Sequence, residues 1–251
     1  MKAVILAAGY ATRLYPLTEN KPKCLLEVAG VSILDRIVEQ LDGVSSLEEI
    51  ILVTNARFFE QLNAWKERAK SRAPVRILND GTTSNDNRLG AVGDIGLAIR
   101  ECKITTDFLL LASDNLFEQS LSGFVDFARS KKDCVTIGIY DLGKPELASK
   151  KFGVIETVPS GEVAGFEEKP EKPKSSFIGM GVYYFPAKTL PLVGEYLAQK
   201  NAQDAPGYYV RWLLGKVKIF SLPFKGLWYD IGDLKSLEEA NQIFKSKNLK
   251  K

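Results

Sequence analysis

Short apolar runs alternate with amphipathic segments along the first part of the chain. Each run has the length of one strand and is rich in Val, Ile and Leu, which is typical of strands buried on both faces of a parallel sheet. The segments between the runs carry apolar residues at every third or fourth position, as amphipathic helices do. The expected strands are 3–7, 49–54, 75–79, 108–112 and 134–140, and the expected helices are 33–41, 58–72, 89–102 and 121–131. This alternation predicts the α/β class, with a doubly wound and mostly parallel sheet.

The pattern changes after about residue 141, where strands become more frequent. Two apolar runs flank a Pro-Ser-Gly turn at 159–161 and predict a β-hairpin. The expected elements of this part are strands at 152–156, 163–170, 177–185 and 217–222 and helices at 190–198 and 234–244. The chain has neither an internal repeat nor a linker long enough to separate independent domains. We therefore expect one domain over 1–251, with an α/β core over about 1–140 and a β-rich part over about 141–251.

The first expected strand runs into a loop of small residues that suits a phosphate group. Ala8 and Gly9 follow the strand, and their small side chains let backbone N–H groups approach a ligand. Arg13 adds a planar cation that matches phosphate, and Lys23 adds a more mobile one. Taken singly, these residues would form a tight turn and a solvated surface, but their order within one unit favours phosphate binding. The stretch lacks the further glycines of a dinucleotide-binding fold and the Gly-Lys-Ser/Thr of a P-loop.

The composition excludes several kinds of chemistry. The chain has 251 residues and no histidine, which rules out histidine bases, histidine metal ligands and Ser-His-Asp catalysis. Catalysis must then use Lys, Arg, carboxylates, backbone groups and metal ions. A net charge of +3 is too small to indicate a nucleic-acid partner, and no apolar run has the length of a membrane span. Because the three cysteines are widely spaced and no signal-peptide pattern is visible, we expect a cytoplasmic protein.

Charged residues follow several expected strands, at the ends where α/β sheets place ligands. Asp114 follows the strand at 108–112, and Asp230 lies in a Trp-Tyr-Asp-Ile-Gly-Asp segment. Carboxylates at such positions are ligands for Mg²⁺, although a lone aspartate is more often a turn or cap residue. Glu168 and Lys169 end the second strand of the hairpin, where they suit a sugar and its phosphate, or alternatively protect a sheet edge.

The residues from Leu6 to Thr18, with those from Lys21 to Leu26, closely resemble the signature of the sugar-1-phosphate nucleotidyltransferases. These are the NDP-sugar pyrophosphorylases, and glucose-1-phosphate thymidylyltransferases belong to them. Further segments that resemble the family lie at 112–115, 167–170 and 228–233. Ser113 stands where the family commonly has Gly, and Asp233 where it has Thr, and neither departure removes a ligand. The resemblance covers most of the chain and implies a Rossmann-like nucleotidyltransferase fold, whose β-rich part binds the sugar and completes the metal site.

The resemblance also implies a role for each site residue. Arg13, Lys23 and Asp114 would be catalytic, and Mg²⁺ would be held by Asp114 and Asp230. The other implied contacts are nucleotide binding by Leu6, Ala8, Gly9 and Gly90, and sugar-phosphate binding by Gly153, Glu168, Lys169 and Gly179.

Two asparagines compete for the contact with the base. In the family, a polar side chain after the third strand and a glycine at the next helix start bind the base, and Gly90 matches that glycine. Asn79 fits by its place at the strand end, and Asn85 fits by its distance from Gly90. Both are expected nucleotide-binding residues, and the sequence leaves open whether the base is a pyrimidine or a purine.

The implied reaction joins an NTP and a sugar-1-phosphate into an NDP-sugar and releases pyrophosphate. An oxygen of the sugar phosphate would attack the α-phosphorus in line, with Mg²⁺ and the cations neutralising developing charge. Because a phosphate is already ionised at neutral pH, no side-chain base is required, which accords with the lack of histidine.

Other interpretations keep the fold but change the function. Phosphocholine or an inositol or glycerol phosphate could replace the sugar phosphate as acceptor. A quaternary amine would need an aromatic box, and the candidates for it are Tyr183, Tyr184, Tyr208, Tyr209 and Trp228. Most of these residues would otherwise pack in the core. A non-catalytic sensor of nucleotide sugars would have lost the cations or metal ligands, which this chain keeps. The sequence leaves open the sugar and the oligomeric state, a homo-oligomer included.

Overall fold

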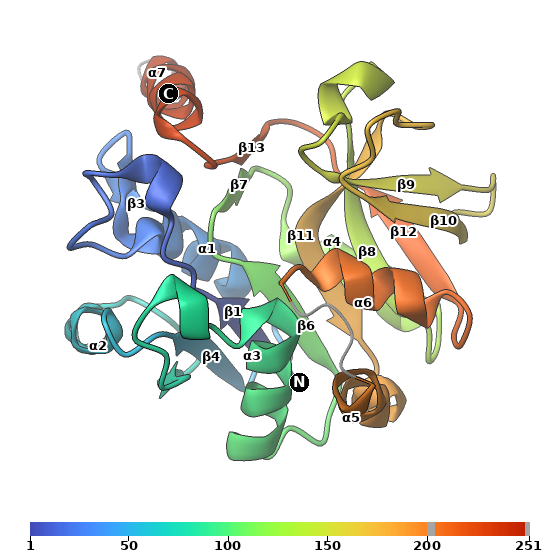
Figure 1. The fold of residues 1–251 in the computed structure, drawn as a ribbon, viewed down its shortest axis with the longest axis horizontal. Coiled ribbons are helices and arrows are strands. Elements are labelled where there is room, and N and C mark those ends of the chain that lie inside the picture. The colour runs from blue at the N-terminus through green and yellow to red at the C-terminus, as the bar shows by residue number, and fades with distance from the viewer. Residues whose placement is uncertain (200–203, 249–251) are drawn as a thin grey trace.

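The computed structural model describes residues 1–199 and 204–248 and has a central β-sheet with helices on both faces (Figure 1). In these ranges nine strands form the sheet, in the order β10-β9-β11-β6-β1-β4-β5, with β8 paired to β11 and β12 paired to β8. The strands are β1 (Lys2–Leu6), β4 (Glu49–Thr54), β5 (Val75–Asn79), β6 (Phe108–Ala112), β8 (Val135–Asp141), β9 (Gly153–Thr157), β10 (Val163–Glu168), β11 (Phe177–Phe185) and β12 (Ile219–Pro223). The helices are α1 (Ile33–Asp42), α2 (Phe59–Lys66), α3 (Gly90–Glu101), α4 (Leu121–Ser130), α5 (Leu190–Ala198), α6 (Pro206–Leu213) and α7 (Leu234–Asn248). A separate two-stranded sheet is formed by β2 (Glu27–Val28) and β3 (Val31–Ser32).

The first half of the sheet is parallel, as the sequence predicts. β1 pairs in parallel with β4 and β6, so that Val4 lies opposite both Ile51 and Leu110, and β4 pairs in parallel with β5. β11 then joins β6 in antiparallel orientation and connects the sheet to β8 and β9. The α/β class and the largely parallel central sheet are confirmed, and β9, β10, β11 and β12, which follow residue 141, continue the same sheet.

Alternate side chains of each parallel strand pack into two cores, one on either face of the sheet. Ala3 and Ile5 of β1 face the core under α1, α2, α4 and α7, whereas Val4 faces the core under α3, α5 and α6. The central residues of β1, β4 and β6 are apolar because both faces of these strands are covered. The indole Nε1 of the buried Trp65 donates to Asp35 Oδ1 at 2.8 Å and thereby ties α2 to α1. In the described part of the chain, no helix combines the length and the apolar character that crossing a membrane requires.

The helix expected at 58–72 is too long, because α2 ends at Lys66. After this residue the backbone turns, and the N–H of Ala69 donates to the carbonyl of Lys66 at 3.2 Å. The N–H of Arg72 then donates to Asp42 Oδ1 at 2.9 Å, which draws the chain back toward the start of β5. A contact with a residue thirty positions away thus ends a helix that the local pattern would continue.

A small sheet beyond β6 joins two distant parts of the chain. β7 (Asn115–Phe117) pairs in antiparallel orientation with β13 (Trp228–Asp230). Next to this pair, the N–H of Ile231 donates to the carbonyl of Asp114 at 2.9 Å. The pairing places Asp230 beside Asp114, although the two lie far apart in the sequence.

The carboxyl ends of β1 and β6 lie where the order of the sheet reverses. From β1 the chain proceeds to β4 and β5 on one side, and it returns to β6 on the other side of β1. Loops that leave neighbouring strands in opposite directions separate at such a switch point and leave a crevice for a ligand.

Candidate active site

Three adjoining cavities at this edge of the sheet form one continuous cleft. The loop cavity, of about 480 Å³, lies between the loop after β1 and the start of α3. The central cavity, of about 220 Å³, shares Gly9 with the loop cavity and contains Lys23 and Asp114. The aromatic cavity, also of about 220 Å³, shares Asp114 with the central cavity. Its aromatic wall consists of Phe152, Phe166, Tyr183 and Trp228.

The cleft brings together the residues singled out in the sequence, with one exception. The loop cavity is lined by Leu6, Ala8, Gly9, Arg13, Asn85, Gly90 and Lys169, the central cavity by Lys23 and Asp114, and the aromatic cavity by Gly153, Glu168, Gly179 and Asp230. Asn79 is not among the residues that line these cavities, and its exposed side chain accepts a hydrogen bond from the N–H of Gly81 at 2.9 Å. Asn85 Oδ1 accepts one from Arg88 Nη1 at 2.8 Å in the wall of the loop cavity.

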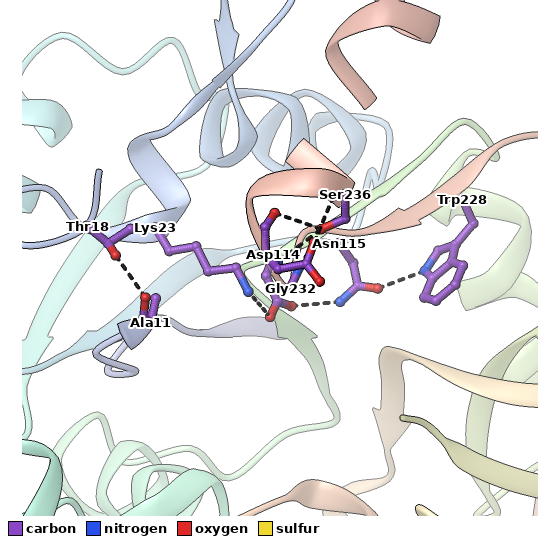
Figure 2. Close-up of polar contacts among 9 residues, drawn as sticks. Ala11, Thr18, Lys23, Asp114, Asn115, Trp228, Gly232 and Ser236 are labelled. Atoms are coloured by element: carbon purple, nitrogen blue, oxygen red, sulfur yellow. Dashed lines mark hydrogen bonds and ion pairs between the residues drawn. The ribbon is translucent and has the colours of Figure 1, made fainter. Parts of the chain in front are cut away.

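The loop after β1 is held in an unusual conformation. Ala11 has a left-handed backbone with a φ of +48°, which residues with a side chain rarely adopt. Its carbonyl accepts a hydrogen bond from the Thr18 hydroxyl at 2.8 Å (Figure 2). It also accepts one from the N–H of Leu14 at 2.9 Å. These bonds fix a 3₁₀ turn at Thr12–Leu14, from which Arg13 lines the loop cavity.

Lys23 and Asp114 form an ion pair at the centre of the cleft. Lys23 Nζ lies 2.7 Å from Asp114 Oδ2, and the two side chains are only 14% and 30% exposed (Figure 2). The other oxygen, Asp114 Oδ1, accepts a hydrogen bond from Asn115 Nδ2 at 2.8 Å. Asn115 Oδ1 in turn accepts one from Trp228 Nε1 at 2.7 Å. Asp114 is therefore oriented by a cation on one side and, on the other, by an amide that β13 holds in place.

Asp230 lies beside this ion pair. Burial and the negative charge of Asp114 raise the pKa of Asp230 to about 7, and the cations Lys23 and Arg13 act in the opposite direction. A Cβ atom on Gly232 would lie 3.4 Å from Asp230 Oδ2 and 3.7 Å from Arg13 Nη2, so the carboxylate and the guanidinium flank the same glycine. Two neighbouring carboxylates in a half-buried cleft repel each other unless a further cation joins them.

Asp114 and Asp230 suit a metal ion that needs few protein ligands. Within residues 1–199 and 204–248, no group of three or more His, Cys, Asp or Glu side chains could enclose a metal ion. Mg²⁺ is commonly held by one or two carboxylates, with water and substrate phosphates completing its shell. A divalent cation would also relieve the repulsion that raises the pKa of Asp230. The pair therefore fits Mg²⁺ better than a metal that requires a full protein cage.

Glu168 and Lys169 face different cavities. The Glu168 side chain is only 8% exposed and lines the aromatic cavity, and burial raises its pKa against the effect of Lys169. Lys169 has a left-handed backbone with a φ of +48° and lines the loop cavity. Its Nζ remains 3.9 Å from Glu168 Oε1. Consecutive residues thus present a carboxylate to one cavity and an ammonium group to the other.

Only part of the aromatic set considered from the sequence lines the aromatic cavity. Tyr183 and Trp228 do, whereas Tyr208 lines the loop cavity and Tyr184 and Tyr209 are buried in the core. The wall is completed by Phe152 and Phe166, and Phe152 packs edge-on against Trp228 with ring centroids 5.4 Å apart. No sequence pattern distinguishes these two phenylalanines, because both lie in apolar strand segments that also suit a core.

The start of α6 packs against Glu168 with no spare room. A Cβ atom on Gly207 would lie 1.9 Å from Glu168 Oε2 and 2.7 Å from Phe166 Cζ. The sequence did not predict α6, because Pro206-Gly207 suggests a turn, although proline also suits the first turn of a helix. Glycine at this position lets the helix approach the floor of the aromatic cavity.

The loop cavity also contains charged residues that were not predicted from the sequence. Arg88 Nη2 lies 3.0 Å from Asp204 Oδ2, and this pair joins the segment before α3 to the segment before α6. Asp80 and Asp94 line the same cavity, and Asp94 is only 5% exposed. Asp94 did carry a signal, since it lies among the apolar positions of an amphipathic helix, where a charged residue is uncommon.

Comparison with known proteins assigns the chain to a family. The family model described as nucleotidyl transferase matches residues 2–247. The bifunctional protein GlmU of Methanocaldococcus jannaschii is 26% identical over 247 residues, which are 98% of this chain and 55% of that protein. Glucose-1-phosphate adenylyltransferase of Bacillus subtilis is 34% identical over 139 residues, which are 53% of this chain and 35% of that protein. The chain thus spans about half the length, or less, of these curated relatives.

The same arrangement of elements occurs in a solved structure. UDP-glucose pyrophosphorylase complexed with UDP-glucose superposes with a TM-score of 0.79 at 21% identity, and the match covers 98% of both chains. At this level of identity the likeness concerns the fold.

The substitution Gly207→Ala tests the close packing of α6. We expect it to lower the free energy of unfolding by about 1–3 kcal/mol, because Phe166 and Glu168 must shift to admit the methyl group. The matched control is Gly194→Ala in α5, where a Cβ atom would meet nothing within 4 Å. We expect this change to stabilise the protein by about 0.5–1 kcal/mol, because alanine favours a helix. Urea unfolding measures both, and equal effects would contradict the account.

The pH dependence of stability tests the buried state of Asp94. Burial, and then the charge of Asp80, raise the pKa of Asp94 from 3.8 to about 8. Between these values the folded chain binds a proton that the unfolded chain releases, so this group makes stability fall as pH rises through the window. We expect Asp94→Asn to reduce that fall and to exceed the wild type in stability at pH 8.

Thermal melts between pH 5 and pH 8 measure this difference. Asp126→Asn on the exposed face of α4 is the control and should leave the slope unchanged. If the stability of the wild type and that of Asp94→Asn change equally with pH, Asp94 is ionised in the folded protein.

Proposed function

The chain belongs to the nucleotidyl transferase family, as its first thirty residues predict, and we propose that it is a sugar-1-phosphate nucleotidyltransferase. It transfers the nucleotidyl group of an NTP to a sugar-1-phosphate and releases pyrophosphate and an NDP-sugar. One observation carries this proposal: Lys23, Asp114 and Asp230 meet where the central and aromatic cavities join. Two polyanions that bind in adjoining cavities repel each other, and a cation with a metal-binding carboxylate pair at the junction counteracts this repulsion.

In this proposal the loop cavity holds the NTP. Ala8 and Gly9 expose backbone N–H groups to phosphate oxygens, and a Cβ atom on Gly9 would meet nothing within 4 Å. Arg13 offers its guanidinium group to the triphosphate and to the leaving pyrophosphate. The base lies against the other lining residues, Leu6, Asn85 and Gly90. The expected contact of Asn79 with the base is carried by Asn85 instead.

Lys23 acts at the α-phosphate, between the two substrates. In the structure its ammonium group neutralises Asp114. Asp114 and Asp230 would hold Mg²⁺, which would supply charge neutralisation at the α-phosphate. With the charge of Asp114 compensated in this way, Lys23 would be free to bind phosphate oxygens.

The aromatic cavity holds the acceptor. Glu168 accepts hydrogen bonds from sugar hydroxyls, and Lys169 places the acceptor phosphate at the junction of the cavities. Gly153 and Gly179 line the cavity without side chains and so leave room for the acceptor. The acceptor phosphate is ionised at neutral pH, so its oxygen attacks without a side-chain base.

The two parts of the chain divide these tasks. The part over about 1–140 binds the nucleotide, and the part over about 141–251 binds the acceptor and supplies Asp230. Glucose-1-phosphate is the first acceptor to test, because relatives and solved structures named for glucose compounds are similar to this chain.

A second candidate acceptor is a phosphorylated amine such as phosphocholine. Tyr183, Trp228, Phe152 and Phe166 surround a cavity that also contains the carboxylate of Glu168. Aromatic faces with a nearby carboxylate bind quaternary ammonium groups. The sugar phosphate remains the first candidate, because the same carboxylate also binds hydroxyl groups.

Release of pyrophosphate tests the proposed function. Each of ATP, GTP, CTP, UTP and dTTP is combined with Mg²⁺ and with glucose-1-phosphate, mannose-1-phosphate, N-acetylglucosamine-1-phosphate, glycerol-3-phosphate, an inositol phosphate or phosphocholine. Release that requires one NTP and one sugar-1-phosphate is the expected result. Release with phosphocholine alone would favour the amine acceptor, and nucleotide binding with no release against any acceptor would indicate a sensor.

Replacement of Lys23 by alanine tests the charge compensation at the junction. We expect kcat to fall by about 10²–10³, the usual effect of losing one preorganised charge, with the fold intact. The control is Lys21→Ala, which removes an exposed lysine two residues earlier in the chain and should leave kcat unchanged. A Lys23→Ala variant with a near-normal rate would exclude this residue from the mechanism.

Metal dependence tests the carboxylate pair. Removal of Mg²⁺ with EDTA should abolish turnover, and Asp230→Asn should lower kcat by about 10²–10³ at saturating Mg²⁺. Asp233→Asn is the matched control, because Asp233 accepts a hydrogen bond from the N–H of Ser236 at the start of α7, a role that asparagine also fills. Equal activity of the two variants, measured as pyrophosphate release, would contradict a metal site at Asp230.

A further inference from the structure

A pair of carboxyl groups lies in the wall of the loop cavity. Asp94 is on the first turns of α3, one helical turn after Gly90, and is only 5% exposed. Asp80 follows the end of β5 and lines the same cavity. Asn85 lines this cavity as well, so the pair lies in the part of the cleft that we assign to the base. Neither carboxylate takes part in the mechanism proposed above.

One of the four oxygens of this pair accepts hydrogen bonds from the chain. Asp80 Oδ1 accepts hydrogen bonds from the N–H and the hydroxyl of Thr82, both at 2.7 Å. Asp80 Oδ2 and Asp94 Oδ1 are buried and, among the described residues, receive no hydrogen bond from any donor group. The two carboxyl groups lie close enough for a shared proton to satisfy both of these oxygens. Asp94 Oδ2 is not among the buried unpaired atoms, and no described residue donates a hydrogen bond to it.

Little in the protein stabilises the negative charge of Asp94 beside Asp80. The pKa of Asp94 is raised to about 8 by burial and by Asp80, and no lysine or arginine opposes the shift. Arg88, a basic residue of the same cavity wall, is bound to Asp204 and Asn85. Asp94 Oδ2 is the oxygen of this side chain that remains open to the cavity, and no described residue supplies it with a donor. An N–H or O–H group of the molecule that fills the loop cavity can therefore donate to it.

We infer that Asp94, positioned by Asp80, selects an NTP whose base carries an exocyclic amino group against UTP and dTTP. This inference rests on the proposed function for its ligand, the NTP. The amino group of adenine, guanine or cytosine donates to an acceptor such as Asp94 Oδ2. Uracil and thymine carry carbonyl oxygens in place of that amino group, and these oxygens are repelled by an acceptor that has no proton to give. A hydrogen bond to a charged carboxyl pair corresponds to about a 10- to 100-fold preference.

Asp94→Ala tests the inference, with Asp94→Asn as the matched control. Alanine removes the acceptor. Asparagine can keep it, because its NH₂ group donates to Asp80 and its carbonyl then occupies the place of Oδ2. Both variants should fold at least as stably as the wild type, since each removes a buried carboxyl group, and thermal melts check this.

The readout is the binding of radiolabelled ATP, GTP, CTP and UTP with Mg²⁺ by equilibrium dialysis, in the absence of any acceptor. We expect the wild type to bind at least one of ATP, GTP and CTP about 10-fold or more tightly than UTP. Asp94→Ala should reduce this ratio to about threefold or less, and Asp94→Asn should retain most of it. A wild type that prefers UTP, that binds no NTP, or whose ratio survives Asp94→Ala would overturn the inference.

The kinetics separate this inference from the proposed function. If pyrophosphate is released with UTP as the preferred nucleotide, the proposed function stands and the base preference is wrong. If no acceptor gives pyrophosphate while the binding ratio depends on Asp94 as described, the proposed function is wrong and the role of Asp94 in nucleotide selection stands.

Discussion

The architecture of the cleft depends on the compensation of two carboxylates that the fold forces together. Asp114 and Asp230 lie far apart in the sequence and meet because β7 pairs with β13. Burial and the charge of Asp114 raise the pKa of Asp230 to about 7, and the Lys23 ammonium group 2.7 Å from Asp114 acts in the opposite direction. A metal ion and two phosphorylated substrates can take over the roles of these charges, which is why a pair that is unfavourable in the free protein suits the reaction we propose.

The rest of the structure holds this cluster at the junction of the cavities. The order of the sheet reverses beside β1, and the loop after that strand is fixed by hydrogen bonds to the carbonyl of Ala11. On the other side of the cleft, α6 packs against Glu168 through Gly207, where a side chain would not fit. Rigid elements thus surround the charged cluster. The strained backbone at Ala11 and the crowded backbone at Gly207 occur beside this cluster, where chain segments and ligands must approach each other closely.

The features predicted from the sequence are those that depend on local patterns, such as strand boundaries and the polar residues at strand ends. The strands β4, β5, β6 and β11 were predicted with the boundaries that the structure has, because mostly apolar runs bounded by polar turns leave little choice. Asp114 and Asp230 were recognised from segments that resemble a family, but their proximity follows from a pairing of β7 with β13 that no local pattern encodes. α6 was missed because its first two residues suggest a turn, and Asp94 was missed because its burial depends on the packing of α3. That Asn85 lines the loop cavity and Asn79 does not likewise depends on the course of the loop after β5, which no local pattern determines.

A crystal structure with Mn²⁺ in place of Mg²⁺, a non-cleavable NTP analogue and glucose-1-phosphate tests the central claim most directly, because anomalous scattering locates the metal without reference to activity. We expect one metal peak bonded to Asp114 and Asp230, with the triphosphate in the loop cavity and the α-phosphate beside Lys23. A metal bound elsewhere, or a nucleotide outside this cleft, would contradict the account.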